Sequence, residues 1–203
     1  MSKLVVISGP SGVGKGTVVE LLKEKYKENN RKLYLSISCT TRLPREGEIN
    51  NVHYIFITEE EFKKRIADGD FLEYNQYGTG KFYGTPKKRV LDYLSDGYDV
   101  ILEIDINGYK QIKENYPDAV GIFIMPPSVD ELLNRLKTRG TETDDVIKTR
   151  ILTAKNEIEN NNIYDYIVVN YNGEQEKTAN DIYNYIRKWF LSFFLSLSYK
   201  IML

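Results

Sequence analysis

The segment that most constrains this chain is a glycine-rich loop near its amino terminus, which joins an apolar strand to an amphipathic helix. The run Leu4–Ser8 is apolar and β-branched, as expected of a strand buried on both faces of a sheet. The loop Gly9–Lys15 follows and fits the spacing GxxxxGK, after which apolar residues recur at helical spacing from Val18 to Tyr26. Backbone N–H groups of such a loop surround phosphate oxygens, and the helix directs its positive end at them. The segment therefore predicts a phosphate-binding loop, and the alternative is a structural glycine turn.

The end of this loop predicts how phosphates and a magnesium ion are held. Lys15 is expected to reach phosphate oxygens as a mobile point charge. The usual pattern continues with Ser or Thr as a Mg²⁺ ligand, but that position is Gly16 here and the hydroxyl comes one residue later, as Thr17. We therefore expect Mg²⁺ to be held either by Thr17 or largely through water.

Strand-like and helix-like segments alternate along the rest of the chain. Further strands are predicted at Leu33–Ser38, His53–Thr58, Tyr98–Gly108, Ala119–Met125 and Tyr164–Asn170, the third of which runs into a turn. Helices are predicted at Glu59–Gly69, Ser128–Gly140, Asp144–Asn160 and Ala179–Phe190, and a loop is predicted at Tyr77–Pro86. Strands that alternate with helices favour an α/β fold with a mostly parallel sheet.

The composition limits the classes of function to be considered. With 203 residues, 41% of them hydrophobic, the chain is long enough for one globular domain with inserted subdomains. A formal net charge of −1 gives no overall basic field, so we expect no nucleic-acid partner. The single cysteine, Cys39, cannot form an internal disulfide, which suits a cytoplasmic protein. Neither Cys39 nor His53 lies in a cluster with metal-ligand spacing, so both are interpreted as bystanders.

The carboxy-terminal segment Trp189–Tyr199 is apolar and carries no charge. It is shorter than the roughly 20 residues that a helix needs to span a bilayer. We expect either a terminal helix packed on the domain or a partly disordered tail, and no stable membrane association. Contact with a membrane surface and self-association are the alternatives.

Five separated motifs resemble the guanylate kinase family. They are Ser8–Thr17, Ser36–Glu48, Phe82–Pro86, Leu102–Gly108, and Pro126–Ser128 together with Arg139–Glu142. The motifs occur in the family's order and cover the chain from Lys3 to about Asn170, whereas the tail after about Trp189 lies outside the resemblance. The resemblance implies Mg²⁺-dependent transfer of the γ-phosphoryl group of ATP to GMP, and also to dGMP, in purine nucleotide metabolism. It leaves the oligomeric state open.

The resemblance also implies a division of the chain. A P-loop core with a parallel sheet flanked by helices is expected from 1–34, 89–126 and 158–190. A GMP-binding α+β insertion is expected at 35–88, a helical lid at 127–157 and an apolar tail at 191–203.

Five residues are expected around the phosphate of GMP. The resemblance places Ser38, Arg42, Arg45 and Tyr54 there, with Glu48 either orienting the arginines or lying at the surface as an ordinary carboxylate. Two guanidinium groups three residues apart on an extended loop can bind one dianion, and hydroxyls can satisfy its remaining lone pairs.

Recognition of the guanine base is implied for Glu73 and Thr85, with Tyr83 alongside. A carboxylate can accept from N1–H and N2–H₂ of guanine, and a hydroxyl can donate to O6; adenine would leave the buried carboxylate unpaired. The segment Glu73–Tyr83 is one residue longer than the usual family spacing, and the extra residue is expected in the turn Gly78–Gly80.

Two carboxylates are expected at the carboxyl end of a buried strand. Glu103 and Asp105 are two residues apart, so both would face the same side of that strand, at the edge where ligands bind in open α/β sheets. One would order the hydration shell of Mg²⁺ and the other would contact the acceptor nucleotide. The family commonly has Asp at both positions, and the alternative is a capping or salt-bridge role.

The resemblance implies a set of residues around ATP. Arg139 and Arg150 match arginines that close over the ATP phosphates, which suits a reaction that needs positive charge around the transferred group. Arg135 is either a helper or a solvated residue, and Asn170 is either a contact on the adenine side or a turn residue. The ATP set is Ser11, Gly12, Val13, Gly14, Lys15, Gly16, Thr17, Arg135, Arg139 and Asn170, and the catalytic set is Lys15, Arg42, Arg139 and Arg150.

Two other functions are compatible with parts of this pattern. A guanylate-kinase-like interaction module that binds peptides has the same fold, but it typically has a degraded phosphate loop. A kinase for another nucleotide or for a sugar phosphate would keep the loop, but it would have no use for Glu73 and Thr85 as a guanine-reading pair.

Overall fold

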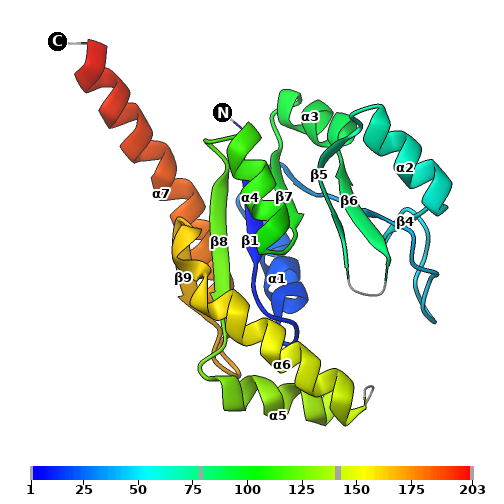
Figure 1. The fold of residues 1–203 in the computed structure, drawn as a ribbon. Helices are drawn as coiled ribbons and strands as arrows, with labels where there is room; N and C mark the ends of the chain where they lie inside the picture. The colour runs from blue at the N-terminus through cyan, green and yellow to red at the C-terminus, as the bar shows by residue number, and fades with distance from the viewer. Residues whose placement is uncertain (1, 78–79, 140–142, 202–203) are drawn as a thin grey trace. The chain divides into compact units, whose positions relative to one another are not determined.

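The structure, a computed structural model, describes residues 2–77, 80–139 and 143–201, and for residues 139 and 189–201 it describes the backbone alone (Figure 1). The chain divides into two compact units. The first consists of Met1–Ile7 and Lys32–Ala119, and the second of Ser8–Arg31 and Val120–Leu203.

A parallel sheet lies in the first unit. Its strands are β1 (Leu4–Ser8), β2 (Leu33–Leu35) and β7 (Asp99–Glu103), and both β1 and β2 pair with β7 in parallel. Every residue of β1 is buried, as the apolar run predicts. The helices α3 (Lys87–Ser95) and α4 (Ile106–Asn115) belong to the same unit and flank β7 in the chain.

The first unit also contains a smaller mixed sheet. Its strand order is β4 (Ile55–Phe56), β3 (Cys39–Thr40), β6 (Phe82–Pro86) and β5 (Phe71–Gln76). The strands β5 and β6 form an antiparallel pair, drawn as the long hairpin in Figure 1. The helix α2 (Glu59–Ala67) buries Phe62 against the rings of Phe71 and Phe82, 4.4 and 5.3 Å away between centroids. This aromatic cluster gives the sheet a core of its own.

The second unit contains the remaining elements. They are α1 (Lys15–Glu28), β8 (Val120–Met125), α5 (Val129–Arg139), α6 (Asp144–Glu159), the short 3₁₀ helix η1 (Asn161–Ile163), β9 (Tyr166–Val169) and α7 (Gln175–Ile201). The strands β8 and β9 pair in parallel. The ring of Tyr183 on α7 meets that of Tyr26 on α1 edge to face at 5.3 Å, and both side chains are buried. No helix in the described part of the chain is both long and apolar enough to cross a membrane.

The predicted fold class is confirmed, and several predicted elements need correction. The predicted loop Tyr77–Pro86 is wrong in its second half, because β6 occupies Phe82–Pro86 and pairs with two strands. The predicted strand at His53–Thr58 shrinks to β4, because Thr58 caps α2 by accepting a hydrogen bond from the Glu61 amide. Part of the predicted strand at Leu33–Ser38 is β2.

The helices at the chain's middle and end also differ from prediction. The sequence pattern did not predict α3 and α4, and α7 is longer at both ends than the predicted Ala179–Phe190. The start of α5 is as predicted, since the Ser128 hydroxyl accepts from the Glu131 amide at 3.1 Å.

Candidate active site

The loop before α1 has the backbone conformation of an anion-binding turn. Gly9 and Gly14 have φ of 151° and 97°, a region that side chains rarely adopt. A Cβ on Gly9 would lie 2.3 Å from the Ile124 carbonyl oxygen, and one on Gly14 would lie 2.7 Å from Nδ2 of Asn170. In the part of the chain that the structure describes, no side chain caps the start of α1, and the first turn of α1 contains no acidic residue. The helix end therefore directs uncompensated N–H groups and positive charge at the loop.

Lys15 lies across its own loop. Its Nζ donates to the carbonyl oxygens of Gly9 and Pro10, at 2.6 and 3.2 Å. Gly16 and Thr17 follow on the first turn of α1, where Thr17 is exposed and a Cβ on Gly16 would meet nothing within 4 Å. The ammonium group and the exposed hydroxyl therefore lie at the same end of α1 as the loop.

Asn170 and Arg135 both bind the backbone of the loop through the carbonyl oxygen of Val13. Asn170 is fully buried, donates from Nδ2 to the Val13 carbonyl oxygen at 2.8 Å and accepts from the Thr178 hydroxyl at 3.1 Å. Arg135 donates to the carbonyl oxygens of Val13 and Asn170, each at 3.1 Å, and to Glu131 at 3.2 Å. The alternative that Arg135 is merely a solvated surface residue is therefore wrong, because its side chain connects the loop to the residue that follows β9.

Of the two predicted lid arginines, the structure describes the side chain of Arg150 but not that of Arg139. Arg150 on α6 donates from Nη1 to the hydroxyl of Ser11 in the loop, at 2.7 Å. Arg139 ends α5, and its side chain and the predicted turn Gly140–Glu142 lie outside the described residues. The structure therefore brings Arg150 to the loop with Ser11.

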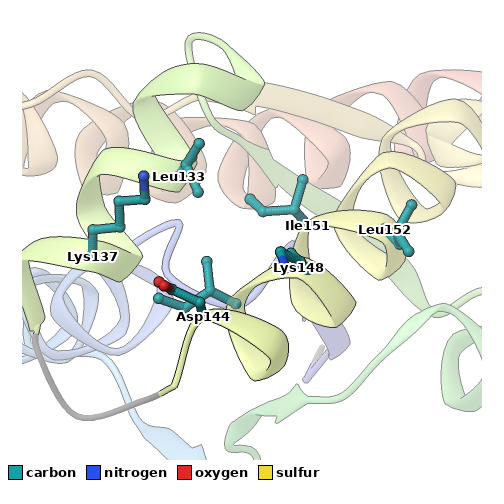
Figure 2. Close-up of a pocket in the computed structure, with 7 residues that line it drawn as sticks. Leu133, Lys137, Asp144, Lys148, Ile151 and Leu152 are labelled. Carbon is teal, nitrogen blue, oxygen red and sulfur yellow. The ribbon is translucent and has the colours of Figure 1, made fainter.

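An apolar groove of about 580 Å³ lies between α5 and α6 (Figure 2). Its lining residues are Leu133, Lys137, Asp144, Ile147, Lys148, Ile151 and Leu152. None of the predicted ATP- and GMP-binding residues whose side chains the structure describes lines it. The residues that line the groove are thus different from those of the phosphate loop.

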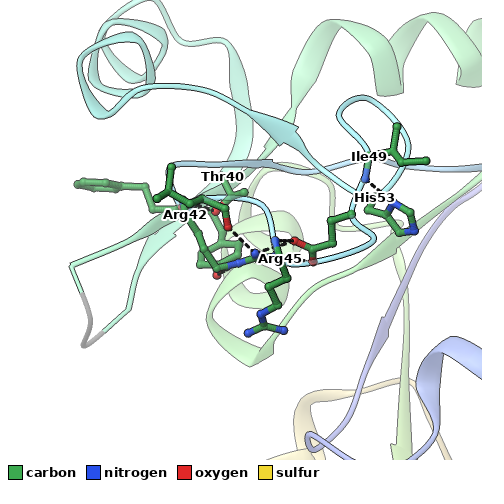
Figure 3. Close-up of polar contacts among 9 residues, drawn as sticks. Thr40, Arg42, Arg45, Ile49 and His53 are labelled. Atoms are coloured by element: carbon green, nitrogen blue, oxygen red, sulfur yellow. Dashed lines mark hydrogen bonds and ion pairs between the residues drawn. The ribbon is translucent and has the colours of Figure 1, made fainter. Parts of the chain in front are cut away.

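In the first unit, Arg42 is held by an almost complete set of acceptors (Figure 3). Its Nη1 and Nη2 bind the two carboxylate oxygens of Glu48 at 2.7 and 2.8 Å. Nη1 also donates to the Leu43 carbonyl oxygen at 2.8 Å, and Nε donates to the Tyr83 hydroxyl at 3.3 Å. A guanidinium has five N–H donors, so these contacts use four and leave one on Nη2.

Glu48 binds the side chain of one predicted phosphate-binding arginine, Arg42, and the backbone of the other, Arg45. Besides its contacts with Arg42, it accepts from the backbone N–H of Arg45 at 2.7 Å. These hydrogen bonds, that from the Arg42 side chain first, lower the pKa of Glu48 to about 2, and the same pair raises the pKa of Arg42. The Arg45 guanidinium has no hydrogen-bond partner among the described residues, and Figure 3 shows its side chain extending away from the cluster.

Tyr54 and Ser38 lie beside this cluster. The Tyr54 ring is 5.2 Å from the Arg42 guanidinium carbon and meets Tyr83 edge to face at 6.0 Å. Burial raises the pKa of the Tyr54 hydroxyl, which therefore stays neutral near pH 7. The Ser38 carbonyl oxygen accepts from the Ile55 amide at 2.9 Å, which fixes the backbone beside β3.

The two bystanders have structural roles. Nδ1 of His53 accepts from the Ile49 amide at 3.0 Å and so stabilises a turn of the same loop (Figure 3). Cys39 is fully buried, and burial raises the pKa of its thiol to about 11. A thiol that stays protonated is a poor nucleophile, in agreement with its interpretation as a bystander.

Glu73 and Thr85 face each other across β5 and β6. Both are buried, and the Thr85 hydroxyl donates to Oε1 of Glu73 at 2.7 Å. Burial raises the pKa of Glu73 to about 7, with the charge of Asp105 acting in the same direction and the hydrogen bond from Thr85 acting against it. A Cβ on Gly108 of α4 would lie 2.8 Å from Oε2 of Glu73. The extra residue predicted in the turn Gly78–Gly80 falls in a segment of which residues 78–79 lie outside the described residues.

Asp105 is not on the strand that precedes it, so the prediction that it faces the same side of that strand as Glu103 is wrong. The strand β7 ends at Glu103, which is exposed, and the backbone then turns so that Asp105 caps α4 by accepting from the Gly108 amide at 2.9 Å. The capping alternative is therefore observed. Asp105 also accepts from the side chains of Asn75 and Tyr77, two residues that the sequence pattern did not indicate.

These features define a class of protein. A glycine loop at a helix start, with a lysine and an arginine beside it, is accompanied by a second polar site with two arginines and a buried carboxylate–hydroxyl pair. Such a combination is that of a P-loop kinase acting on a small phosphorylated acceptor. The guanylate kinase family model matches residues 1–188, and the chain belongs to the guanylate kinase family.

Relatives and a solved structure agree with this family. The chain is 52% identical to a guanylate kinase of Clostridium tetani, over 82% of this chain and 77% of the relative. It is 50% identical to that of Bacillus subtilis, over 84% and 82%. A crystal structure of guanylate kinase from Anaplasma phagocytophilum is similar with a TM-score of 0.73 and 34% identity, covering 92% of this chain and 85% of that one. The predicted family, fold class and enzyme class, a nucleoside monophosphate kinase, are confirmed.

Proposed function

We propose that this chain transfers the γ-phosphoryl group of ATP to GMP, giving ADP and GDP, and that dGMP is a second acceptor. The observation that supports the acceptor is the buried pair Glu73–Thr85, joined at 2.7 Å across β5 and β6. The carboxylate can accept from N1–H and N2–H₂ of guanine, and the Thr85 hydroxyl can turn from Glu73 to donate to O6. AMP would leave a buried carboxylate without donors, so it should be rejected strongly. The relatives named guanylate kinase support the same reaction.

The phosphates of ATP are assigned to the loop and to the start of α1. The backbone N–H groups from Ser11 to Thr17 surround them, and Lys15 exchanges its contacts with the Gly9 and Pro10 carbonyl oxygens for phosphate oxygens. Arg135 and Asn170 act by keeping the Val13 carbonyl turned away from the anion, since both donate to it. Their assignment to the ATP site is therefore that of positioning residues.

The phosphate of GMP is assigned to the loop around β3. Arg45 supplies an intact guanidinium fork, whereas Arg42 supplies the one N–H that its contacts with Glu48, Leu43 and Tyr83 leave over. The hydroxyls of Ser38 and Tyr54 complete the set. The number of N–H donors left on each guanidinium therefore makes Arg45 the main phosphate ligand and Arg42 the minor one.

The transferred group is assigned to Arg139 and Arg150. Positive charge around its equatorial oxygens is what phosphoryl transfer requires of a protein. Arg150 already contacts Ser11 of the loop. Closure of the predicted lid 127–157 and insertion 35–88 over the bound substrates would exclude water and so prevent simple hydrolysis of ATP.

The residues present fit Mg²⁺ held mainly through water. The described residues contain no cluster of three metal-ligating side chains, while Thr17 and Glu103 are both exposed oxygen donors. Mg²⁺ usually keeps several waters and binds through one or two protein oxygens and the substrate phosphates. When bound, the ion would neutralise charge on the β and γ phosphates, with Thr17 either binding it directly or holding one of its waters, and Glu103 ordering its waters. Asp105 is occupied by three donors and is assigned to the acceptor nucleotide instead.

The proposed location is the cytoplasm, where ATP and GMP are available and purine nucleotides are interconverted. A buried, unpaired cysteine agrees with a reducing compartment.

The test is an ADP-release assay with MgATP and, in parallel, GMP, dGMP, AMP, UMP and no acceptor. Turnover on GMP with AMP slower by several orders of magnitude is the expected result. Equal rates with and without acceptor, or preference for another monophosphate, would contradict the assignment of a guanine-binding site. The assignment of the phosphate loop would remain valid. No turnover on any acceptor would favour the interaction-module alternative.

A further inference from the structure

Three polar side chains, two on β5 and one directly after it, lie against the start of α4. Glu73, Asn75 and Tyr77 are spaced by two, so they project from the same face of the hairpin. A Cβ on Gly108 of α4 would meet Glu73, while Asn75 and Tyr77 both donate to Asp105, the cap of the same helix. The hairpin that bears the guanine-reading pair is thereby joined to α4.

The donors to Asp105 fill most of its capacity. Oδ1 accepts from the Gly108 amide at 2.9 Å and from Nδ2 of Asn75 at 3.2 Å, and Oδ2 accepts from the Tyr77 hydroxyl at 2.8 Å. A carboxylate oxygen accepts about two hydrogen bonds, so Oδ1 is full and Oδ2 has one place left among the described residues. Asp105 can therefore accept one further N–H or O–H, in a direction that Tyr77 determines.

A helix cap does not require these additional donors. The bond from Gly108 already satisfies the capping geometry of α4. Tyr77 is 41% exposed, so its burial contributes little to stability, yet its ring meets that of Tyr83 edge to face at 5.2 Å. Tyr83 in turn accepts from Arg42. The Tyr77 side chain thus lies between the carboxylate assigned to the acceptor nucleotide and the arginine assigned to its phosphate.

We propose that Tyr77 and Asn75 are positioning residues for the acceptor nucleotide, which hold the Asp105 carboxylate so that its one remaining acceptor site faces GMP. The inference rests on the proposed function, since it assumes that GMP is the acceptor. It assigns a role to two residues that neither the phosphate loop nor the guanine-reading pair includes.

The experiment compares Tyr77→Phe and Asn75→Ala with the wild-type chain. Tyr77→Phe removes one hydroxyl and keeps the ring contact with Tyr83. The matched control is Tyr74→Phe, the same chemical change at a residue of β5 that is also 41% exposed and whose backbone is hydrogen-bonded to the side chain of Gln111. The measurements are the Kd of GMP by titration calorimetry without ATP, the KM values of GMP and ATP, and Tm.

The expected result is a GMP Kd and KM raised about threefold to tenfold by Tyr77→Phe and by Asn75→Ala, which corresponds to the net contribution of one ordinary hydrogen bond. The KM of ATP and the Tm should remain at wild-type values, and Tyr74→Phe should change nothing. A role in stability alone would lower Tm and change both KM values together, which would overturn the inference. Unchanged GMP affinity in both variants would overturn it as well.

The wild-type control separates this inference from the proposed function. Wild-type chain that neither binds nor phosphorylates GMP would contradict the proposed function itself. Wild-type chain that does both, with variants that bind GMP equally well, would contradict only the role of Tyr77 and Asn75.

Discussion

At the scale of single residues, the protonation of Glu73 should set the pH range in which GMP binds. Burial raises the pKa of this carboxyl to about 7, and only the ionised form can accept from both N–H groups of guanine. The Kd of GMP should therefore be constant above about pH 8 and rise by up to about tenfold per pH unit below about pH 6. Calorimetric titration with GMP across this range measures it.

The control for that pH profile is Glu73→Gln, which cannot ionise. It should bind GMP weakly and show only the pH dependence that comes from the GMP phosphate, whose second pKa is about 6 and which affects wild type and variant alike. A wild-type profile that is flat from about pH 6 to 8, or identical to that of the variant, would show that Glu73 does not meet the base.

The orientation of the Arg42 side chain, and the position of the backbone at Arg45, depend on Glu48. Glu48→Gln keeps the shape but removes the charge that holds the Arg42 guanidinium and the Arg45 amide. The KM of GMP should rise about tenfold while that of ATP stays the same, because charge-assisted hydrogen bonds to the arginine are lost. Glu46→Gln, two residues away and exposed, is the matched control in the same kinetic assay. Equal effects of the two changes would indicate a general loss of charge.

The resemblance to the family indicated pairs of residues that the structure brings into contact. Glu73 and Thr85 were expected together and lie 2.7 Å apart, and Glu48 was expected to orient arginines that lie three and six residues before it. Asn75 and Tyr77 were not expected, because their common partner Asp105 lies on another element and alternation along a strand does not reveal what its face meets.

At the scale of elements, the junction of the phosphate loop and α1 tolerates no side chain at Gly14. Gly14→Ala would place a methyl group 2.7 Å from Nδ2 of Asn170 in a backbone conformation with φ of 97°. The strain should lower stability by about 1 to 3 kcal/mol and raise the KM of ATP more than that of GMP. Thermal unfolding and steady-state kinetics measure the two effects.

Gly97 provides the control for backbone strain alone. It also has positive φ, at 82°, but a Cβ there would meet nothing within 4 Å. Gly97→Ala should therefore lower Tm without changing the KM of ATP. If Gly14→Ala and Gly97→Ala have the same kinetics, the contact with Asn170 does not shape the loop.

Elements with strong local patterns were predicted, whereas those that depend on distant partners were not. The buried run of β1 and the capped helices α2 and α5 carry their own signals in composition and caps. The strand β6 contains Gly84 and Pro86 and exists because it pairs with β3 and β5. The cap of α4 was taken for the end of a strand, since Asp105 follows β7 so closely.

At the scale of the whole molecule, the residues assigned to the ATP phosphates and those assigned to GMP belong to different compact units. A substitution in one set should therefore affect the binding of one nucleotide and not of the other. Each ligand stabilises the folded chain by about 2.7 kcal/mol at 100 times its Kd. Lys15→Met should abolish the Tm shift with ATP and keep that with GMP, and Arg45→Ala should do the reverse. Thermal shift assays of both variants with each nucleotide test the assignment. Loss of both shifts in either variant would contradict it.

The family and fold class were readable from the sequence because five motifs span nearly the whole chain. The donor count of Arg42 and the occupancy of Asp105 were not, because they depend on how many partners converge on one group in space.

Because the thiol of Cys39 is fully buried in the small sheet, its reaction with an alkylating reagent can be used to measure local opening of that sheet. The thiol lies on β3, beneath the aromatic cluster of α2, and the chain has no second cysteine to compete for reagent. Alkylation must therefore wait for this sheet to open, and its rate at a fixed reagent concentration reports the free energy of that opening. GMP should slow the labelling, because the loop that binds its phosphate begins at this strand. Labelling as fast as that of a free thiol would mean that the sheet is open in solution.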